Sequence, residues 1–396
     1  MKKMAVLILL LIFVHPAFAQ NTWLTRTSFA GIQRDDAVGF SIGSNGYLGT
    51  GMDVGFQLQK DFWKYDTAND LWTQVADFGG TPRQYCVAFS CNGKGYVLTG
   101  IDNSSLFKND IWEYDEVANT WLMKSPLPAL GRSGAVGFAI DDFGYVGTGF
   151  DGTNYFNDFW RYDPVTDSWL QLPNFLGTPR YVAAAFAVGG RGYVGTGKSA
   201  GNNLLNDIFE FDPIGNNWVQ KPDFPGTPRF SAEGFSLYQF GYIGTGLDVN
   251  GNYCNDFYAY NYFDGNWIIA AALPSTLRKG AASFTVINKV YFGTGIDTNN
   301  IRLNDWWEYT SMVGNEEISE AIQLSVFPNP TNGVIQVTCK TIIDKISIYD
   351  RTGKEVLVQA INSYSSIIDL ENRPSGLYFY GIQISNNEYF GKVIMQ

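Results

Sequence analysis

Six arginines recur along the chain at nearly constant spacing, and their pattern is the one that most suggests chemistry. Successive members are 49, 49, 48, 49 and 49 residues apart: Arg34, Arg83, Arg132, Arg180, Arg229 and Arg278. Each begins a strand expected to line one mouth of a closed ring, where guanidinium groups would bind anions. Two like charges about 10 Å apart repel by about 1.7 kcal/mol at an effective dielectric of 20, so the ring needs carboxylate partners.

Aspartates at a matching repeat position are the expected partners of these arginines. They are Asp53, Asp102, Asp151, Asp248 and Asp297. If every arginine pairs with such a carboxylate, the ring is structural and locks the loops. If some guanidinium groups stay free, the mouth binds an acidic ligand. The sequence leaves both hypotheses open.

The fourth repeat departs from this pattern. Lys198 and Ser199 stand where the other repeats carry the aspartate, which would leave Arg180 without its local partner. The neighbouring loops vary most between repeats, and loops carried on a rigid scaffold are where binding usually resides. We therefore predict a ligand site at this mouth that combines the six arginines with Lys198, Phe56, Phe107, Tyr155 and Tyr253; Asn202, Asn203 and Arg302 lie in the same loops.

Several classes of chemistry are excluded by composition. The single histidine, His15, lies in a segment that we expect to be removed, so Ser-His-Asp and Cys-His catalysis and imidazole metal sites are excluded. The net charge of −11 argues against nucleic acid, because phosphate binding needs a surplus of lysine and arginine. Residues 248–252 have calcium-like oxygen spacing but lack the distal glutamate. We expect no catalytic residue, no cofactor and no metal.

Residues 1–19 are predicted to be a secretory signal peptide. Lys2 and Lys3 precede an apolar run over residues 4–14, and residues 17–19 form an Ala-Phe-Ala cleavage site. Loss of two lysines and no acid changes the net charge from −11 to −13. Because no later apolar run reaches the length of about 18 residues that a membrane-spanning helix needs, we expect a secreted or surface-exposed chain with no membrane span.

The arginines belong to six repeats of about 49 residues. Each arginine is followed by a glycine-rich strand end such as residues 144–149 (GYVGTG), an Asp-aromatic strand such as residues 158–162, and, in five repeats, a tryptophan such as Trp169. Four short strands per repeat are typical of a β-propeller blade. We read the tryptophans, which fall at repeat positions, as packing residues rather than sugar platforms.

The sixth repeat has no closing tryptophan, but residues 21–23 (Asn-Thr-Trp) match residues 119–121 at the end of the second. We therefore expect residues 20–312 to form a six-bladed propeller whose last blade is closed by an N-terminal strand near residues 21–25. Such closure removes exposed sheet edges.

A glycine pair that ends the second strand, followed by a spaced Tyr and Trp, resembles the kelch repeat over about residues 21–310, with Gly-Thr-Gly in place of the glycine pair. The resemblance implies a propeller fold that hosts binding modules, often for acidic peptides on this face, and a few enzymes. Among these are a copper-radical sugar oxidase and a sialic acid epimerase. The oxidase needs two histidines, so its activity should not carry over, and the epimerase also relies on a histidine, which disfavours it here.

Residues 313–322 are predicted to be a linker, and residues 323–396 a small β-sandwich. Seven short strand-like runs are separated by turn residues: 324–327, 334–339, 346–349, 355–358, 367–370, 377–384 and 389–395.

This tail resembles the C-terminal sorting domain of type IX secretion cargo in residues 327–330 (Phe-Pro-Asn-Pro), 348–350 with Gly353, 376–378 (Gly-Leu-Tyr) and Lys392. The resemblance implies the outer-membrane secretion machinery as the partner of residues 323–396. The alternative is an ordinary carbohydrate-binding or spacer sandwich.

The sequence thus predicts an all-β fold, a six-bladed kelch-type β-propeller followed by a small β-sandwich. For function we expect a non-catalytic module that recognises a protein or glycan through the propeller loop face. The alternative is a histidine-independent carbohydrate-active enzyme, epimerase-like or lyase-like. Paired carboxylates about 5–9 Å apart in the mouth would favour the enzyme, and arginines all paired with aspartates would favour the binding module. A purely structural surface protein would differ from the module mainly in ligand strength.

Overall fold

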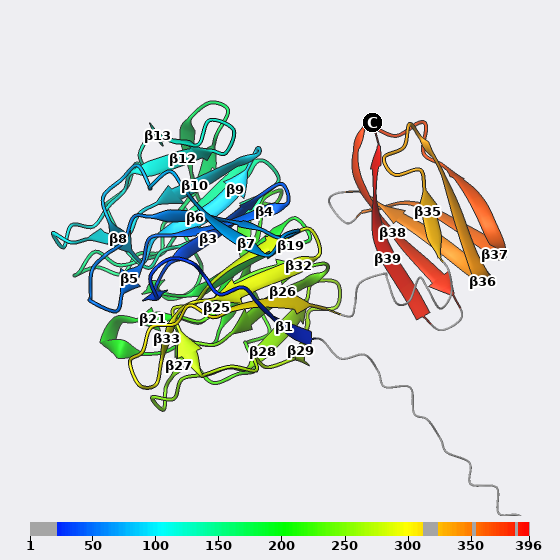
Figure 1. The fold of residues 1–396 in the computed structure, drawn as a ribbon. Helices are drawn as coiled ribbons and strands as arrows, with labels where there is room; N and C mark the ends of the chain where they lie inside the picture. The colour runs from blue at the N-terminus through cyan, green and yellow to red at the C-terminus, as the bar shows by residue number, and fades with distance from the viewer. Residues whose placement is uncertain (1–21, 312–323, 351–353, 385–386, 396) are drawn as a thin grey trace, which may run out of the picture.

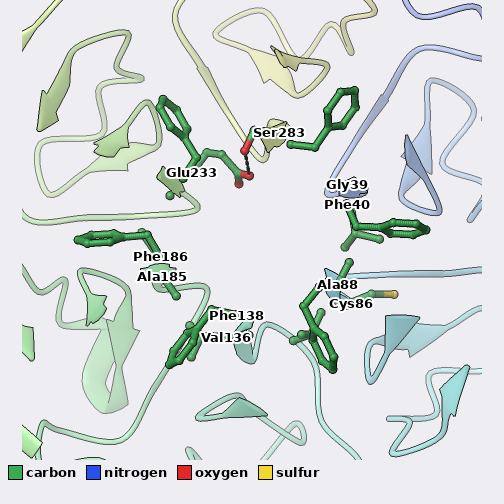
Figure 2. Close-up of a pocket in the computed structure, with 18 of the residues that line it drawn as sticks. Gly39, Phe40, Cys86, Ala88, Val136, Phe138, Ala185, Phe186, Glu233 and Ser283 are labelled. Atoms are coloured by element: carbon green, nitrogen blue, oxygen red, sulfur yellow. Dashed lines mark hydrogen bonds between the residues drawn. The ribbon is translucent and has the colours of Figure 1, made fainter. Parts of the chain in front are cut away.

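The computed structural model describes residues 22–311, 324–350, 354–384 and 387–395. The predicted signal peptide and linker lie outside these residues. Residues 22–311 form six four-stranded antiparallel sheets (Figure 1). Their inner strands surround a central channel (Figure 2). The predicted all-β, six-bladed propeller is therefore confirmed.

Each blade runs from the channel outward through four strands of five residues. The inner strands are β3 (Val38–Ile42), β9 (Val87–Cys91), β14 (Val136–Ile140), β19 (Ala184–Val188), β25 (Glu233–Leu237) and β31 (Ala282–Val286). The second strands are β4 (Asn45–Gly49), β10 (Lys94–Leu98), β15 (Phe143–Gly147), β20 (Arg191–Gly195), β26 (Phe240–Gly244) and β32 (Lys289–Gly293).

The third strands are β6 (Phe62–Asp66), β12 (Ile111–Asp115), β16 (Phe159–Asp163), β22 (Ile208–Asp212), β28 (Phe257–Asn261) and β34 (Trp306–Thr310). The outer strands are β7 (Leu71–Val75), β13 (Thr120–Lys124), β17 (Ser168–Leu172), β23 (Asn217–Lys221), β29 (Asn266–Ala270) and, in the sixth blade, β1 (Thr22–Arg26). β1 pairs antiparallel with β34, with Trp23 opposite Tyr309, so the N-terminal strand completes the last blade.

Short ribbons beside the inner strands define what we call the loop face. They are β2 (Arg34–Asp35) with β5 (Met52–Asp53), β8 (Arg83–Gln84) with β11 (Ile101–Asp102), β18 (Arg180–Tyr181) with β21 (Lys198–Ser199), β24 (Arg229–Phe230) with β27 (Leu247–Asp248), and β30 (Arg278–Lys279) with β33 (Ile296–Asp297). Blade three has a single bridge there, between Ser133 and Phe150. The 3-10 turn η1 (Ala200–Asn202) follows β21.

The glycine before the tyrosine of the second strand is required by packing between blades. A Cβ atom at Gly192 would lie 2.1 Å from the ring of Phe138, and one at Gly241 would lie 1.9 Å from the ring of Phe186. Both phenylalanines belong to the inner strand of the preceding blade. Phe138 also stacks on Tyr145 of its own blade, with ring centroids 5.5 Å apart. The Gly-Tyr pair therefore recurs because the phenylalanine of the preceding blade leaves no room for a side chain at the glycine.

The outer-strand tryptophans also join neighbouring blades. The indole N–H of Trp121 donates to the Ala76 carbonyl at 3.1 Å, and its ring packs edge-on against Phe62. The same hydrogen bond to the preceding blade is made by Trp23, Trp72, Trp169, Trp218 and Trp267. The structure thus supports reading these tryptophans as packing residues.

The described part of the tail forms one five-stranded sheet around its own core. Its strands are β35 (Ser325–Phe327), β36 (Val334–Tyr349), β37 (Glu355–Asp369), β38 (Gly376–Ile384) and β39 (Asn387–Met395). The prediction of seven short strands was wrong, because residues 334–339 and 346–349 share β36, and 355–358 and 367–370 share β37. Register shifts between β36 and β37 make irregularities where we expected breaks. Residues from both ends of the long strands share the core: Ile335, Ile348, Ile368, Ile382 and Val393.

Candidate functional site: the loop face and the central channel

Each of the six arginines is buried and forms a two-pronged ion pair within its own blade. In blade four, Nη1 of Arg180 donates to Oδ1 of Asp207 at 2.5 Å and Nη2 donates to Oδ2 at 2.8 Å. Nη1 also donates to the Thr196 carbonyl and Nε to the Thr178 carbonyl, both at 2.9 Å. The same arrangement joins Arg34–Asp61, Arg83–Asp110, Arg132–Asp158, Arg229–Asp256 and Arg278–Asp305.

The predicted role of the arginines in a ligand site is therefore wrong. All six are at most 1% exposed, and their donors are used by the aspartate and by backbone carbonyls. The suggestion that Arg180 lacks a partner is also wrong, because Asp207 supplies one. Burial acts to raise the pKa of Asp61, but hydrogen bonds and charge from Arg34 outweigh it and lower that pKa overall.

The aspartates predicted to pair with the arginines do not do so through their side chains. Asp248 pairs with Arg229 only along the backbone, and its Oδ1 accepts hydrogen bonds from the N–H groups of Asn250 and Asn252 at 2.8 Å. Burial acts to raise the pKa of Asp248, but these loop hydrogen bonds lower it overall. Similar loop caps are made by Asp53, Asp102, Asp151 and Asp297.

In residues 248–252, which have calcium-like oxygen spacing, the aspartate side chain is used by the loop itself. The carboxylate of Asp248 already accepts hydrogen bonds from its own loop. Among the described residues, no group of three or more His, Cys, Asp or Glu side chains is placed to hold a metal ion.

In every blade the true partner is an aspartate directly before the third strand. Asp158 lies directly before β16, and the indole N–H of Trp160 donates to its Oδ2 at 2.7 Å, a bond that recurs in blades one, two and six. A backbone hydrogen bond joins each such site to the next blade: the N–H of Gly149 donates to the Arg180 carbonyl at 2.8 Å. Gly149 has a φ of 102°, a backbone conformation that favours glycine. The sequence did carry this signal, because an aspartate follows each arginine by 26 or 27 residues.

In blades four to six, the loop face carries two lysines, Lys198 and Lys279, that both lie near the ring of Phe230. The ammonium group of Lys198 lies 5.5 Å from the ring centroid of Phe230, and that of Lys279 lies 5.3 Å from the same centroid. Lys279 is also 5.9 Å from the ring of Tyr253. The structure therefore links the predicted residues Lys198 and Tyr253 through Phe230 and Lys279, which the sequence analysis missed.

Three aromatic rings gather next to this group, in blades three and four. Phe150 lies 4.6 Å from Tyr155 and 5.2 Å from Tyr181, and the two tyrosine rings are 5.6 Å apart. All three are partly exposed. Phe107 reaches the same region, because a Cβ atom at Gly152 would lie 3.1 Å from its ring. We call Phe150, Tyr155 and Tyr181 the aromatic cluster.

Phe56, the remaining predicted residue, belongs to a different part of the face. Its ring is 71% exposed and lies 4.8 Å from the guanidinium carbon of Arg302. Arg302 itself is buried and donates to Asp35 at 2.6 Å. This pair locks blades six and one together, so Phe56 covers a structural contact.

Three of the residues missed here, Tyr181, Phe230 and Lys279, share one signal. The position directly after the invariant arginine of each repeat is filled by Asp35, Gln84, Ser133, Tyr181, Phe230 or Lys279. Variation inside an otherwise regular repeat marks this position.

A ring of backbone hydrogen bonds narrows the channel at the loop face. Two residues after each arginine, the N–H group donates to the same position in the preceding blade at 2.7–3.1 Å: Asp36 to Gly280, Gly280 to Ser231, Ser231 to Val182, Val182 to Gly134 and Gly134 to Tyr85. At the remaining seam, the Tyr85 side chain interacts with the Asp36 carboxyl. Burial and the neighbouring charge of Asp35 raise the pKa of Asp36. We call this ring the throat.

Behind the throat, the channel has a cavity volume of about 460 Å³ and walls of mostly small residues. Glu233 and, at the throat, Asp36 are its carboxyl-bearing residues. Oε1 of Glu233 accepts a hydrogen bond from the Ser283 hydroxyl at 2.7 Å, and the pair projects from the wall toward the channel centre (Figure 2). Burial raises the pKa of Glu233 to about 8, so the carboxyl is largely protonated at neutral pH. Neither member of the pair was singled out from the sequence.

Comparison with known proteins agrees with this architecture. Residues 325–396 match the family of secretion system C-terminal sorting domains, and residues 149–176 match the kelch motif. No curated protein matches the chain. Among solved structures, 510 chains match. One, described as the structure of YjhT, is 18% identical with a TM-score of 0.61 over 70% of this chain and 95% of that chain, a likeness that shows the fold alone.

The chain is thus a kelch-type β-propeller followed by a C-terminal secretion sorting domain. It is an exported protein of the cell surface or the extracellular medium, and its sorting domain is the part that addresses the secretion machinery. Within the described ranges, the structure contains no helix with the length and apolar character needed to cross a membrane.

Proposed function

We propose that the propeller is a non-catalytic recognition module whose loop face binds an extracellular glycan. The aromatic cluster is the observation that carries this proposal. Its rings are partly exposed and lie within 4.6–5.6 Å of one another, unlike the inter-blade tryptophans. Aromatic side chains offer a broad apolar surface, and tyrosine adds a hydroxyl that can meet a polar ligand.

The charge arrangement supports recognition rather than catalysis. Each of the six repeat arginines is paired with an aspartate of its own blade, as expected for a binding module. The cationic groups that border the cluster are Lys198 and Lys279. Among the described residues, neither has a carboxylate within ion-pair distance, and both contact the ring of Phe230. A protein ligand remains the other form of this hypothesis, with the lysines as its principal contacts.

The histidine-independent carbohydrate-active enzyme is a second candidate, and one observation favours it. A carboxyl with a pKa of about 8, such as that of Glu233, can act as a general acid near neutral pH. Glu233 lies behind the throat, however, whereas the aromatic cluster lies outside it. The recognition module therefore uses the more accessible residues.

A glycan array probed with the full-length secreted protein tests the proposal. We expect Tyr181→Ala to weaken binding about tenfold, since ring contacts of this kind are worth about 0.5–1.5 kcal/mol beyond burial. Tyr364→Ala is the matched control, because Tyr364 is 58% exposed in the tail. An acidic-peptide panel on the same plates separates the protein alternative. Equal binding by wild type and Tyr181→Ala would contradict the proposal, and turnover of a bound sugar that Glu233→Gln abolishes would favour the enzyme.

A further inference from the structure

The pair Glu233–Ser283 stands where the other blades have small or branched apolar residues. Its members are the residue four after one arginine and the residue five after the next arginine. Between blades two and three the same two positions are in contact, because a Cβ atom at Gly137 would lie 2.1 Å from Val87. By sequence position, all five other seams combine Val or Ala with Gly or Ala. Only blades five and six place a carboxyl against a hydroxyl.

The channel wall offers hydrogen-bond acceptors beside this carboxyl. Each inner strand pairs with a second strand along one edge, so alternate backbone N–H and C=O groups on the other edge face the channel. Two such carbonyls already accept wall hydroxyls, Ala187 from Ser236 at 2.6 Å and Ser236 from Thr285 at 2.9 Å. The others need polar partners from whatever fills the channel.

The charge of the wall has one sign. Its titratable residues are Asp36, Glu233, Tyr85 and Cys86, and none of the lining residues is a lysine or arginine. Burial raises the pKa of the Cys86 thiol to about 12, and Tyr85 also titrates above its usual range because of the nearby charge of Asp36. Only a carboxyl can therefore become charged here near neutral pH, and an ionised Glu233 would have no cation beside it.

The throat limits what can enter from the loop face. Five of the six seams are joined by backbone hydrogen bonds. Six backbones at about that spacing make a hexagon about 10 Å between opposite members, which leaves an opening of roughly one alkyl chain once atomic radii are subtracted. A sugar ring is too wide for that opening. An unbranched chain fits it.

We propose that the channel binds the end of an unbranched primary amine, such as an alkylammonium ion or a lysine side chain, with Glu233 as its counter-ion. An ammonium group has three donors and no acceptor. The Glu233 carboxylate and the channel-facing carbonyls accept those donors, and the alkyl stem occupies the throat. This site is separate from the aromatic cluster and does not depend on glycan binding.

Ligand-observed NMR with the full-length protein and n-butylamine tests this site, with 1-butanol as the neutral probe of equal length. We expect n-butylamine to bind at pH 8 and 1-butanol to bind at least tenfold more weakly. Glu233→Gln should weaken n-butylamine binding at least tenfold. Asp141→Asn, which alters an exposed carboxylate at a turn outside the channel lining, should leave it unchanged.

The pH profile of the wild-type protein gives a second measurement that needs no variant. Between pH 8 and pH 6 the ionised fraction of Glu233 falls about tenfold per unit below its pKa of about 8, while the amine stays charged. Affinity should fall in parallel. Absence of n-butylamine binding, equal binding of 1-butanol, or binding that is unchanged both at pH 6 and in Glu233→Gln would overturn the proposal.

Discussion

Replacing Arg180 with alanine distinguishes a structural arginine from a ligand-binding one. Arg180 is 0% exposed, and its removal leaves the Asp207 carboxylate, 23% exposed, without its cation. Breaking a buried ion pair from one side costs about 3–5 kcal/mol. At roughly 2–4 °C per kcal/mol for a large domain, the melting temperature should fall by about 6–20 °C. The effect should be the same with and without ligand.

Differential scanning calorimetry on Arg180→Ala and Lys198→Ala measures this effect with a matched control. Lys198 lies on the same face and is partly exposed, so its truncation should change stability by less than about 0.5 kcal/mol. Combining Arg180→Met with Asp207→Leu should recover part of the loss, because neither charge is then left unpaired. An Arg180→Ala protein that melts like wild type but fails to bind glycans would refute the reasoning.

Two further predictions concern packing and pH. Gly192→Ala should destabilise the propeller by about 1–3 kcal/mol in urea unfolding, because its Cβ would lie 2.1 Å from the Phe138 ring; Gly55→Ala, with its nearest neighbour at 3.3 Å, is the control, and equal effects would contradict the packing argument. Because the pKa of Glu233 is higher in the native state than in the unfolded chain, protonation of Glu233 stabilises the native state. That contribution to the free energy of unfolding is complete below the unfolded pKa and is lost as pH rises through about 8. Glu233→Gln should therefore gain stability relative to wild type between pH 5 and pH 9 in thermal melts, and a constant difference would argue against a perturbed carboxyl.

The fold could be predicted from the sequence because the repeat is an energetic unit. The glycine before each tyrosine, the outer tryptophan and the arginine each serve one inter-blade or intra-blade contact, so their spacing reports the blade period directly. The closing strand followed from the same logic, since Trp23 makes the hydrogen bond to Ala271 that the other outer tryptophans make to their preceding blades. The tail was harder, because irregular pairing between Thr338 and Lys345 interrupts the alternation without ending β36.

The partner of each arginine could not be chosen from spacing alone. Every repeat holds an aspartate directly before the third strand, and five hold another just after the Thr-Gly that follows the second strand. Both sets recur with the same period, so periodicity carries no information about which one the guanidinium reaches. The decision depends on side-chain direction. The Arg180 side chain points to Asp207 and the Thr196 carbonyl, and it donates hydrogen bonds to both. The loop aspartates instead accept hydrogen bonds from the backbone of their own loops.

Departures from the repeat are informative for the opposite reason. A position that satisfies the same packing in every blade says little about function, whereas a change that needs a compensating change in the next blade says more. Glu233 is such a case, because a carboxyl at that position would face an apolar wall unless the neighbour at position 283 supplied a hydroxyl. The Ser283 hydroxyl donates to Oε1 and the Ser283 backbone also hydrogen-bonds the carboxyl, but neither supplies a cation. Two coordinated substitutions that stop short of neutralising the charge are better explained by an occupant that completes the site than by stability of the empty ring.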